Sequence, residues 1–297
     1  MKILITGATG LIGRALCHVL QDHNLVALSR DAKKARSCLP ANTTVISSLE
    51  SVDFNTLDAI INLAGEPIAE RRWTQSQKQR IYSSRVTLTR TISLKIKAAT
   101  RKPEVMISGS AIGYYGRQPS NLLIDESFGD FHDEFSHQLC RDWENATHTI
   151  DPSTRVCILR TGIVLSKQGG AMAKLKPQFQ FGLGGKISDG EHIMSWIHID
   201  DMVNAIVFLL TNENCSGVYN LTAPNPVNNL AFSQTLAATL ARPCWFTTPA
   251  WLLKLLFGEM ADLLIFGQAV IPLRLQQAGF QFRYPTLDTA LAQLYGA

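Results

Sequence analysis

The sequence predicts an α/β protein: a doubly wound parallel sheet joined to a smaller C-terminal α/β lobe. Short apolar runs rich in β-branched residues alternate with helical patterns as far as Arg160, which is typical of a parallel sheet covered by helices. A glycine-rich turn directly follows the first of these runs. Beyond Arg160, glycine-rich loops and short helices separated by prolines indicate a second lobe.

The elements of the sheet are expected in regular order. A strand at 2–6, an amphipathic helix at 14–21 and a strand at 25–28 form the first strand–helix–strand unit. Further strands are expected at 45–47, 58–65, 105–110, 155–160, 194–199 and 217–221. Further helices are expected at 75–99, at 135–149, and from an N-cap at Asp200 or Asp201 to Leu210.

Two domains follow from this order. The nucleotide-binding domain is expected to take residues 1–165 and about 191–222. The smaller substrate lobe is expected to take residues 166–190 and 223–297, where prolines punctuate short helices.

Composition excludes several classes of protein. The 297 residues are 46% hydrophobic and 18% charged, with a net charge of +4, so neither disorder nor a collagen-like fibre is expected. No run of five Lys or Arg occurs, so nucleic acid is not expected as a partner. The most apolar stretch, 251–273, contains three charged residues and a proline, so no membrane span is expected.

Cysteine and histidine spacing indicates a cytoplasmic chain without a metal site. The six cysteines include no Cys-x-x-Cys pair, which favours reduced thiols over disulfides or zinc ligation. No two histidines have the spacing of a helical zinc pair. The apolar run in MKILIT is too short for the core of a signal peptide.

The glycine turn predicts a dinucleotide site. Gly7, Gly10 and Gly13 form G-x-x-G-x-x-G between the first strand and the first helix. In this pattern the first glycine permits a tight turn, the second lets a pyrophosphate approach the backbone, and the third lets helix and strand pack closely. The alternative is a glycine-rich turn that binds nothing.

The residues at the end of the second strand indicate which dinucleotide the site is expected to bind. An acidic residue there would bind the ribose 2′-hydroxyl of NAD, but this chain has Ser29 and Arg30. A hydroxyl and a guanidinium suit the 2′-phosphate of NADP(H). The alternative is that Arg30 is a solvated loop charge.

Motifs along the whole chain resemble the extended short-chain dehydrogenase/reductase superfamily, with its Rossmann sheet. They are TGATGLIG (6–13), DAIINLAG (58–65), SGSAIGYYG (108–116), LRTGIVL (159–165) and WIHIDDM (196–202). GEPIAERRW (65–73) and FGLGG (181–185) narrow the resemblance to the epimerase-family, or NADP-binding sugar-epimerase-like, branch. The tail, with FGEMADLLIFGQAVIP and AGFQFRYPTLDTAL, resembles that branch's own C-terminal extension.

The resemblance implies positions for the cofactor. Those around the pyrophosphate are Gly7, Thr9, Gly10, Leu11, Ile12 and Gly13. Those expected elsewhere along the cofactor are Ser29 and Arg30 at the 2′-phosphate, Leu63, Ala64 and Gly65 on the adenine-ribose side, Arg85 from the following helix, and Val164 beside the nicotinamide. The alternative for Leu63 and Val164 is that they only pack in the hydrophobic core.

The catalytic pair of the superfamily is absent. Its chemistry uses Ser or Thr with Tyr-x-x-x-Lys, but none of the six tyrosines here has a lysine four residues later. Ser110 resembles the serine. Depending on the alignment, Ser136 and Cys140, or Phe135 and Leu139, stand where Tyr and Lys should be. The substitute proton carriers considered are Tyr114, Tyr115, Glu66, His137 and Cys140, each of which also has a purely structural explanation.

The sequence is compatible with two functions. The first is an NADP(H)-binding oxidoreductase or epimerase-like protein acting on a small polar substrate, with sugar-like molecules among the candidates, in a cleft between the lobes. The alternative is a non-catalytic NADP(H)-binding redox sensor or regulatory protein, because the Tyr-x-x-x-Lys pair is missing. The expected partner is a small molecule, and the expected assembly is a monomer or a homodimer, without nucleic acid or membrane.

Overall fold

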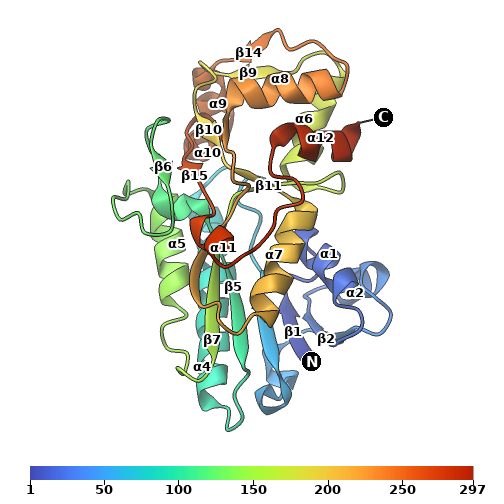
Figure 1. Cartoon of the computed structure of the whole chain (residues 1–297). Coiled ribbons are helices and arrows are strands. Elements are labelled where there is room, and N and C mark those ends of the chain that lie inside the picture. Colours follow the sequence, from blue (N-terminus) through green and yellow to red (C-terminus); the bar gives the residue numbers. More distant parts are fainter. Residues whose placement is uncertain (297) are drawn as a thin grey trace.

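The computed structural model describes residues 1–296 and has a seven-stranded sheet at its centre (Figure 1). Every strand pairs with its neighbours in parallel, in the order β12-β7-β5-β4-β1-β2-β3. The strands are β1 (Lys2–Thr6), β2 (Asn24–Leu28), β3 (Thr44–Ile46), β4 (Ala59–Asn62), β5 (Val105–Ala111), β7 (Arg155–Thr161) and β12 (Gly217–Leu221). The predicted fold class, a doubly wound parallel sheet of the Rossmann type, is confirmed.

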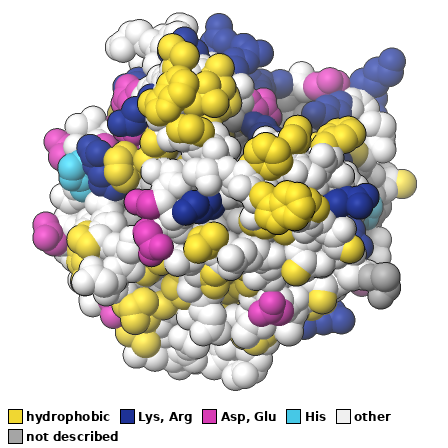
Figure 2. Space-filling view, turned by 90° about the horizontal axis from the view of Figure 1, so that it is seen from above, with side chains coloured by type: hydrophobic (Ala, Val, Ile, Leu, Met, Phe, Trp, Pro, Cys, Tyr) yellow, Lys and Arg dark blue, Asp and Glu magenta, His cyan; other side chains and the backbone are white. Residues whose placement is uncertain are grey.

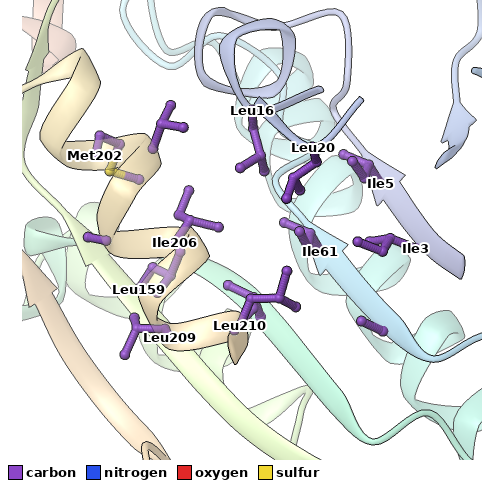
Figure 3. Packing of buried hydrophobic residues seen from close by; sticks show 14 of the residues in the cluster. Ile3, Ile5, Leu16, Leu20, Ile61, Leu159, Met202, Ile206, Leu209 and Leu210 are labelled. Atoms are coloured by element: carbon purple, nitrogen blue, oxygen red, sulfur yellow. The ribbon is translucent and has the colours of Figure 1, made fainter. Parts of the chain in front are cut away.

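Helices cover both faces of this sheet. They are α1 (Leu11–Val19), α2 (Ala32–Cys38), α3 (Gln75–Tyr82), the π-helical turn η3 (Ser83–Thr87), α4 (Leu88–Ala98), α5 (Phe135–Asn145) and α7 (Ile199–Thr211). Alternation along the strands separates two hydrophobic cores. Ile3 and Ile5 pack in a cluster with α1 and α7, whereas Leu4 packs in a cluster with Ile92 and Ile96 of α4 (Figure 3 shows the first cluster).

A smaller group of elements lies beyond the end of the sheet opposite the N-terminus (Figure 1). Its helices are α6 (Gly170–Gln180), α8 (Asn229–Thr239), α9 (Ala250–Phe257), α10 (Asp262–Ile265) and α12 (Leu287–Tyr295), whereas the short helix α11 (Leu273–Gln277) packs against β12 of the main sheet. Its paired strands are β6 (Leu123–Ile124) with β15 (Ala269–Val270), β8 (Ile163–Leu165) with β11 (Trp196–His198), β9 (Gly185–Ile187) with β14 (Phe246–Thr248), and β10 (Ile193–Met194) with β13 (Val227–Asn228). Short 3₁₀ turns complete the chain: η1 (Leu49–Ser51), η2 (Phe54–Thr56), η4 (Ile112–Tyr115) and η5 (Gly258–Ala261).

The division into two domains stays a prediction. A separate hydrophobic cluster includes Met172, Phe232 and Leu291, which lie in the expected lobe. Leu275 and Phe280, from the same expected lobe, pack with the main sheet instead. The tail of the chain therefore ties the two groups of elements together.

Two details of the sequence prediction were wrong. The strand expected at 194–199 is broken at Ser195, whose hydroxyl donates to the Gln268 carbonyl oxygen at 2.7 Å and accepts from the Val270 amide at 2.9 Å. The N-cap of α7 is His198, whose ring nitrogen accepts from the Asp200 amide at 3.1 Å, and not Asp200 or Asp201. Asp201 instead accepts the amides of Arg283 and Tyr284, a long-range contact that local sequence does not reveal.

Candidate functional site

The three glycines of the first turn have different physical roles. Gly7 has a φ of +71°, and a Cβ there would lie 2.6 Å from the carbonyl carbon of Leu63. A Cβ on Gly13 would overlap the Gly7 carbonyl oxygen. Gly10 has an ordinary extended backbone, with φ at −75°, and a Cβ there would meet only the Gly7 carbonyl oxygen, at 3.1 Å. Packing therefore requires glycine at 7 and 13, whereas position 10 borders open space.

That open space is a pocket of about 350 Å³. Its walls are Gly7, Gly10, Leu11, Ile12, Gly13, Leu63, Ile163, Val164, Gly170 and Ala171. Seven of the residues predicted to contact a cofactor are among them. Ile163, Gly170 and Ala171 were not predicted, although the glycine pair at 169–170 is a signal visible in the sequence.

Two helix N-termini meet at this pocket. Helix α1 begins after Gly10 and helix α6 after Gly169, and neither N-cap residue supplies a side-chain hydrogen bond. Neither helix has an acidic residue in its first turn. The unbonded amides and the positive ends of both helix dipoles favour an anion between them.

The remaining predicted cofactor residues do not line this pocket. Arg30 is exposed, and its guanidinium has no hydrogen bond or ion pair within residues 1–296. Ser29 is buried, and its hydroxyl donates to the Asp31 carbonyl oxygen at 3.0 Å. Thr9 lies within the glycine turn, and Ala64 donates its amide to the Thr6 hydroxyl at 3.2 Å.

Arg85 reaches the end of β4 from a distorted turn of helix. It lies in the π-helical turn η3, a distortion that often marks functional sites. Its Nη1 donates to the Glu66 carbonyl oxygen at 2.9 Å, and a Cβ on Gly65 would lie 2.7 Å from its guanidinium carbon. Ser84 in the same turn accepts the Glu66 amide at 2.8 Å. Burial lowers the pKa of Arg85, so an anion near its guanidinium would be stabilising.

A buried polar row crosses the carboxyl ends of three strands. Ser110 on β5 is paired in register with Arg160 on β7, which is paired with Asn220 on β12. Glu144 of α5 joins them: it accepts from Ser110 Oγ at 2.6 Å, from Arg160 Nε at 2.9 Å and from Arg160 Nη2 at 2.8 Å. Tyr115 completes this Ser110–Glu144–Arg160–Asn220–Tyr115 cluster, donating to Asn220 Oδ1 at 2.8 Å and accepting from Arg160 Nη1 at 3.1 Å.

The cluster fixes the ionisation of its members. Burial by itself lowers the pKa of Arg160, but the hydrogen bonds and charge of Glu144 outweigh it, so the pKa of Arg160 is raised. Burial raises the pKa of Tyr115 to about 12, and its side chain is fully enclosed. Tyr115 is therefore poorly suited to exchanging protons with a ligand near neutral pH.

Tyr114 is held differently from Tyr115. It is half-buried, and the guanidinium carbon of Arg160 lies 3.4 Å from the centroid of its ring. Its carbonyl oxygen is hydrogen-bonded by His137 Nδ1, and Phe131 packs edge-on at 4.9 Å. The Tyr114 hydroxyl has no hydrogen-bond partner within residues 1–296, so it remains available to a ligand.

Comparison with known proteins identifies the family. Residues 3–222 match the model described as "NAD dependent epimerase/dehydratase family". The chain belongs to this family. Residues 248–294 match a second model, described as "Domain of unknown function (DUF1731)".

Members of the epimerase family resemble the chain over its full length. The Arabidopsis thaliana "Epimerase family protein SDR39U1 homolog, chloroplastic" is 38% identical and covers 98% of this chain and 86% of its own. The Mycobacterium leprae epimerase family protein ML0860 is 36% identical over 98% of this chain and 94% of its own. A crystal structure of human epimerase family protein SDR39U1 with NADPH has a TM-score of 0.92 at 31% identity, covering 99% of both chains.

In one alignment the missing Tyr–Lys pair falls on Ser136 and Cys140, both buried in this epimerase-family chain; in the other it falls on the half-buried Phe135 and the buried Leu139. Ser136 and Cys140 lie one helical turn apart on α5, and a Cβ on Gly113 would lie 3.2 Å and 3.8 Å from their side chains. Burial raises the pKa of Cys140 to about 12, so it is a neutral thiol near pH 7. The buried His137 bonds the Tyr114 carbonyl oxygen, a positioning contact. None of these three residues reproduces the Tyr–Lys chemistry.

Within residues 1–296 the structure has no cluster of His, Cys, Asp or Glu able to hold a metal ion. No helix in that range is long and apolar enough to cross a membrane.

Proposed function

We propose that this epimerase-family chain binds NADP(H) in the pocket at the glycine turn. The observation that carries the proposal is the pair of uncapped helix N-termini that meet beside Gly10. A pyrophosphate there would accept hydrogen bonds from backbone amides and neutralise both helix dipoles. The human relative whose structure contains NADPH supports the choice of cofactor.

Different residues of the site would contact different parts of the cofactor. Gly7, Thr9, Gly10, Leu11, Ile12 and Gly13 would hold the pyrophosphate, with Gly170 and Ala171 closing the opposite wall. Leu63, Ala64 and Gly65 would border the adenine-ribose side, Arg85 would supply positive charge, and Val164 would pack beside the nicotinamide. When bound, NADP(H) supplies hydride transfer at its nicotinamide ring.

We expect the chain to prefer NADPH to NADH, because Arg30 lies exposed just beyond β2 and its guanidinium has no partner among residues 1–296. In Arg30→Ala, NADPH binding should weaken by about 1.5–3 kcal/mol, the range for a hydrogen bond to a charged group, while NADH binding stays the same. Fluorescence titration with both cofactors measures this. Arg36→Ala, an exposed arginine on α2, is the matched control. Equal affinity of the wild type for both cofactors would contradict the assignment.

We further propose an atypical oxidoreductase or epimerase-like activity on an unidentified small polar substrate, with sugar-like molecules among the candidates. Ser110 and Tyr114 would face the reacting group, because Ser110 stands at the carboxyl end of β5 and the Tyr114 hydroxyl is unbonded. Glu66, half-buried at the end of β4, is the remaining candidate acid or base. Tyr115 would act as a positioning residue, since it is enclosed and holds Arg160.

Any activity is expected to be slow towards ordinary sugar nucleotides and simple ketones. No tuned tyrosine stands beside Ser110, and general acid–base help is worth about 10²–10⁴-fold in rate. A substrate screen would be followed by Ser110→Ala, Tyr114→Phe, Tyr115→Phe and Glu66→Gln on any turnover found, with NADPH binding as the check on folding. Fast turnover that survives all four changes would place the active site elsewhere.

The second candidate function is a non-catalytic NADP(H)-binding redox sensor. The observation that favours it is the closed cluster around Glu144 and Arg160, in which Ser110 already donates its hydrogen bond at 2.6 Å. A sensor needs tight cofactor binding but no proton carrier. Tight NADPH binding without turnover across a broad screen would favour the sensor over the enzyme.

A further inference from the structure

An apolar surface is exposed at the far end of the smaller group of elements. Its members are Phe181, Leu183, Trp245, Phe246, Trp251, Leu255 and Leu256, which we call the lobe tip. Trp245 is 85% exposed, Phe181 81%, and Trp251 and Leu255 66% each. Isolated exposed apolar residues are ordinary, but seven from one end of a molecule mark a contact surface.

Pairing between strands brings four members of the lobe tip together, and α9 with the other three follows directly in the chain. Phe246 of β14 is paired in register with Gly185 of β9, which follows Phe181 and Leu183 closely in the chain. A Cβ on Gly182 would lie 3.9 Å from Pro243, just before Trp245. Helix α9, which carries Trp251, begins two residues after β14 ends. Figure 2, viewed onto this end, shows groups of hydrophobic side chains with Lys and Arg beside them.

Helix α9 buries little of its own apolar surface. Its sequence is AWLLKLLF, and only Leu253 is buried. Trp251 and Leu255, four residues apart, are on one exposed side, and Lys254 is next to Leu255. A surface helix normally turns its apolar stripe towards the core, so α9 presents a stripe that the rest of the described chain leaves uncovered.

Charge distinguishes this end from the rest of the chain. No Asp or Glu occurs between Asp151 and Asp189 or between Glu213 and Glu259, although the whole chain has 24 acidic and 28 basic residues. The basic residues of these stretches that belong to the smaller group of elements are Lys167, Lys174, Lys176, Lys186, Arg242 and Lys254. Lys254 pairs with Asp262 at 4.0 Å, and Asp189 and Glu259 lie at the ends of these stretches. The lobe tip therefore combines projecting aromatic and aliphatic side chains with Lys186, next to Gly185 on β9, and Arg242, just before Trp245.

We propose that the lobe tip docks on an anionic lipid surface. Aromatic side chains favour the boundary between headgroups and hydrocarbon, and nearby Lys and Arg are attracted to anionic headgroups. In a symmetric contact with a second copy the lobe tip would meet an identical surface, and none of its seven members is acidic to offset Arg242, so charge favours the lipid surface. This contact is peripheral and needs no spanning helix.

Vesicle binding tests the proposal with the full chain. Vesicles of phosphatidylcholine with about one-third phosphatidylglycerol should co-sediment the protein and shift tryptophan emission to shorter wavelength, while phosphatidylcholine alone binds weakly. Raising the salt concentration should weaken binding, because the attraction is partly screened. No binding to the mixed vesicles, or equal binding to both kinds, would overturn the proposal.

Paired variants distinguish binding through the lobe tip from nonspecific adsorption of the protein to vesicles. The double variant Trp251→Ser/Leu255→Ser should partition about tenfold more weakly into the mixed vesicles. Leu94→Ser, at a 52% exposed leucine on α4, should bind as the wild type does. Unchanged NADPH binding in both shows that the fold is intact. Equal partitioning of the two variants overturns the proposal, as does a monomeric double variant of a protein that is otherwise a dimer.

Discussion

Replacing Arg160 with Met should lower the free energy of unfolding by about 3–5 kcal/mol, the cost of breaking one side of a buried ion pair. The Glu144 carboxylate would stay buried without its cation, since the side chains of Arg160 and Glu144 are 5% and 7% exposed. The Tyr115 hydroxyl would lose its donor and the Tyr114 ring its stacked guanidinium. Urea unfolding, followed by circular dichroism, measures the change.

Arg141→Met is the matched control for that experiment. Arg141 also pairs with a carboxylate, Asp142 at 3.4 Å, but the two side chains are 50% and 33% exposed. An exposed pair of this kind contributes about 0–1 kcal/mol. Equal losses in the two variants would show that Arg160 does not hold the cluster together.

The Gly10→Val variant should lose NADPH binding while it keeps its fold. A side chain at position 10 enters the pocket, and its Cβ meets only the Gly7 carbonyl oxygen at 3.1 Å. Valine is a poor N-cap residue, so a stability loss of about 1 kcal/mol is expected from α1. Titration with NADPH and thermal unfolding of the same preparation measure both effects.

Gly7→Ala is the control, because it should reduce the stability of the fold, whereas Gly10→Val should mainly reduce NADPH binding. Gly7 has a φ of +71° and lies against the Leu63 backbone, so alanine there should disturb the fold itself. NADPH affinity that stays at the wild-type value in a folded Gly10→Val protein would contradict the proposed binding site.

Local sequence patterns were enough to predict the central sheet and the glycine turn that borders the pocket. The strand at 2–6, the glycine turn and the following helix are adjacent in the chain. Their spacing in the sequence is therefore sufficient to predict the local strand–turn–helix structure. Five of the seven predicted residues that line the pocket belong to this turn and helix, whereas Leu63 and Val164 lie far along the chain and were expected only from the family resemblance. The wall at Gly170 was missed because it comes from α6, far along the chain, and only the folded structure places it beside Leu11.

The polar cluster could not be predicted because its members come from separate elements. Ser110, Arg160 and Asn220 are brought into one row by the register of β5, β7 and β12. Nothing in the local sequence marks Glu144 on α5, yet its carboxylate accepts hydrogen bonds from both Ser110 and Arg160. A buried charge pair is visible in a sequence only when the pairing of strands is already known.

A crystal structure with NADPH tests the binding site most directly. We predict the pyrophosphate against the amides at Gly10–Leu11 and Gly170, the 2′-phosphate on Arg30, and the nicotinamide beside Val164 with Ser110 or Tyr114 as the nearest polar side chain. NADPH bound elsewhere on the molecule, with the pocket at the glycine turn unfilled, would contradict the account.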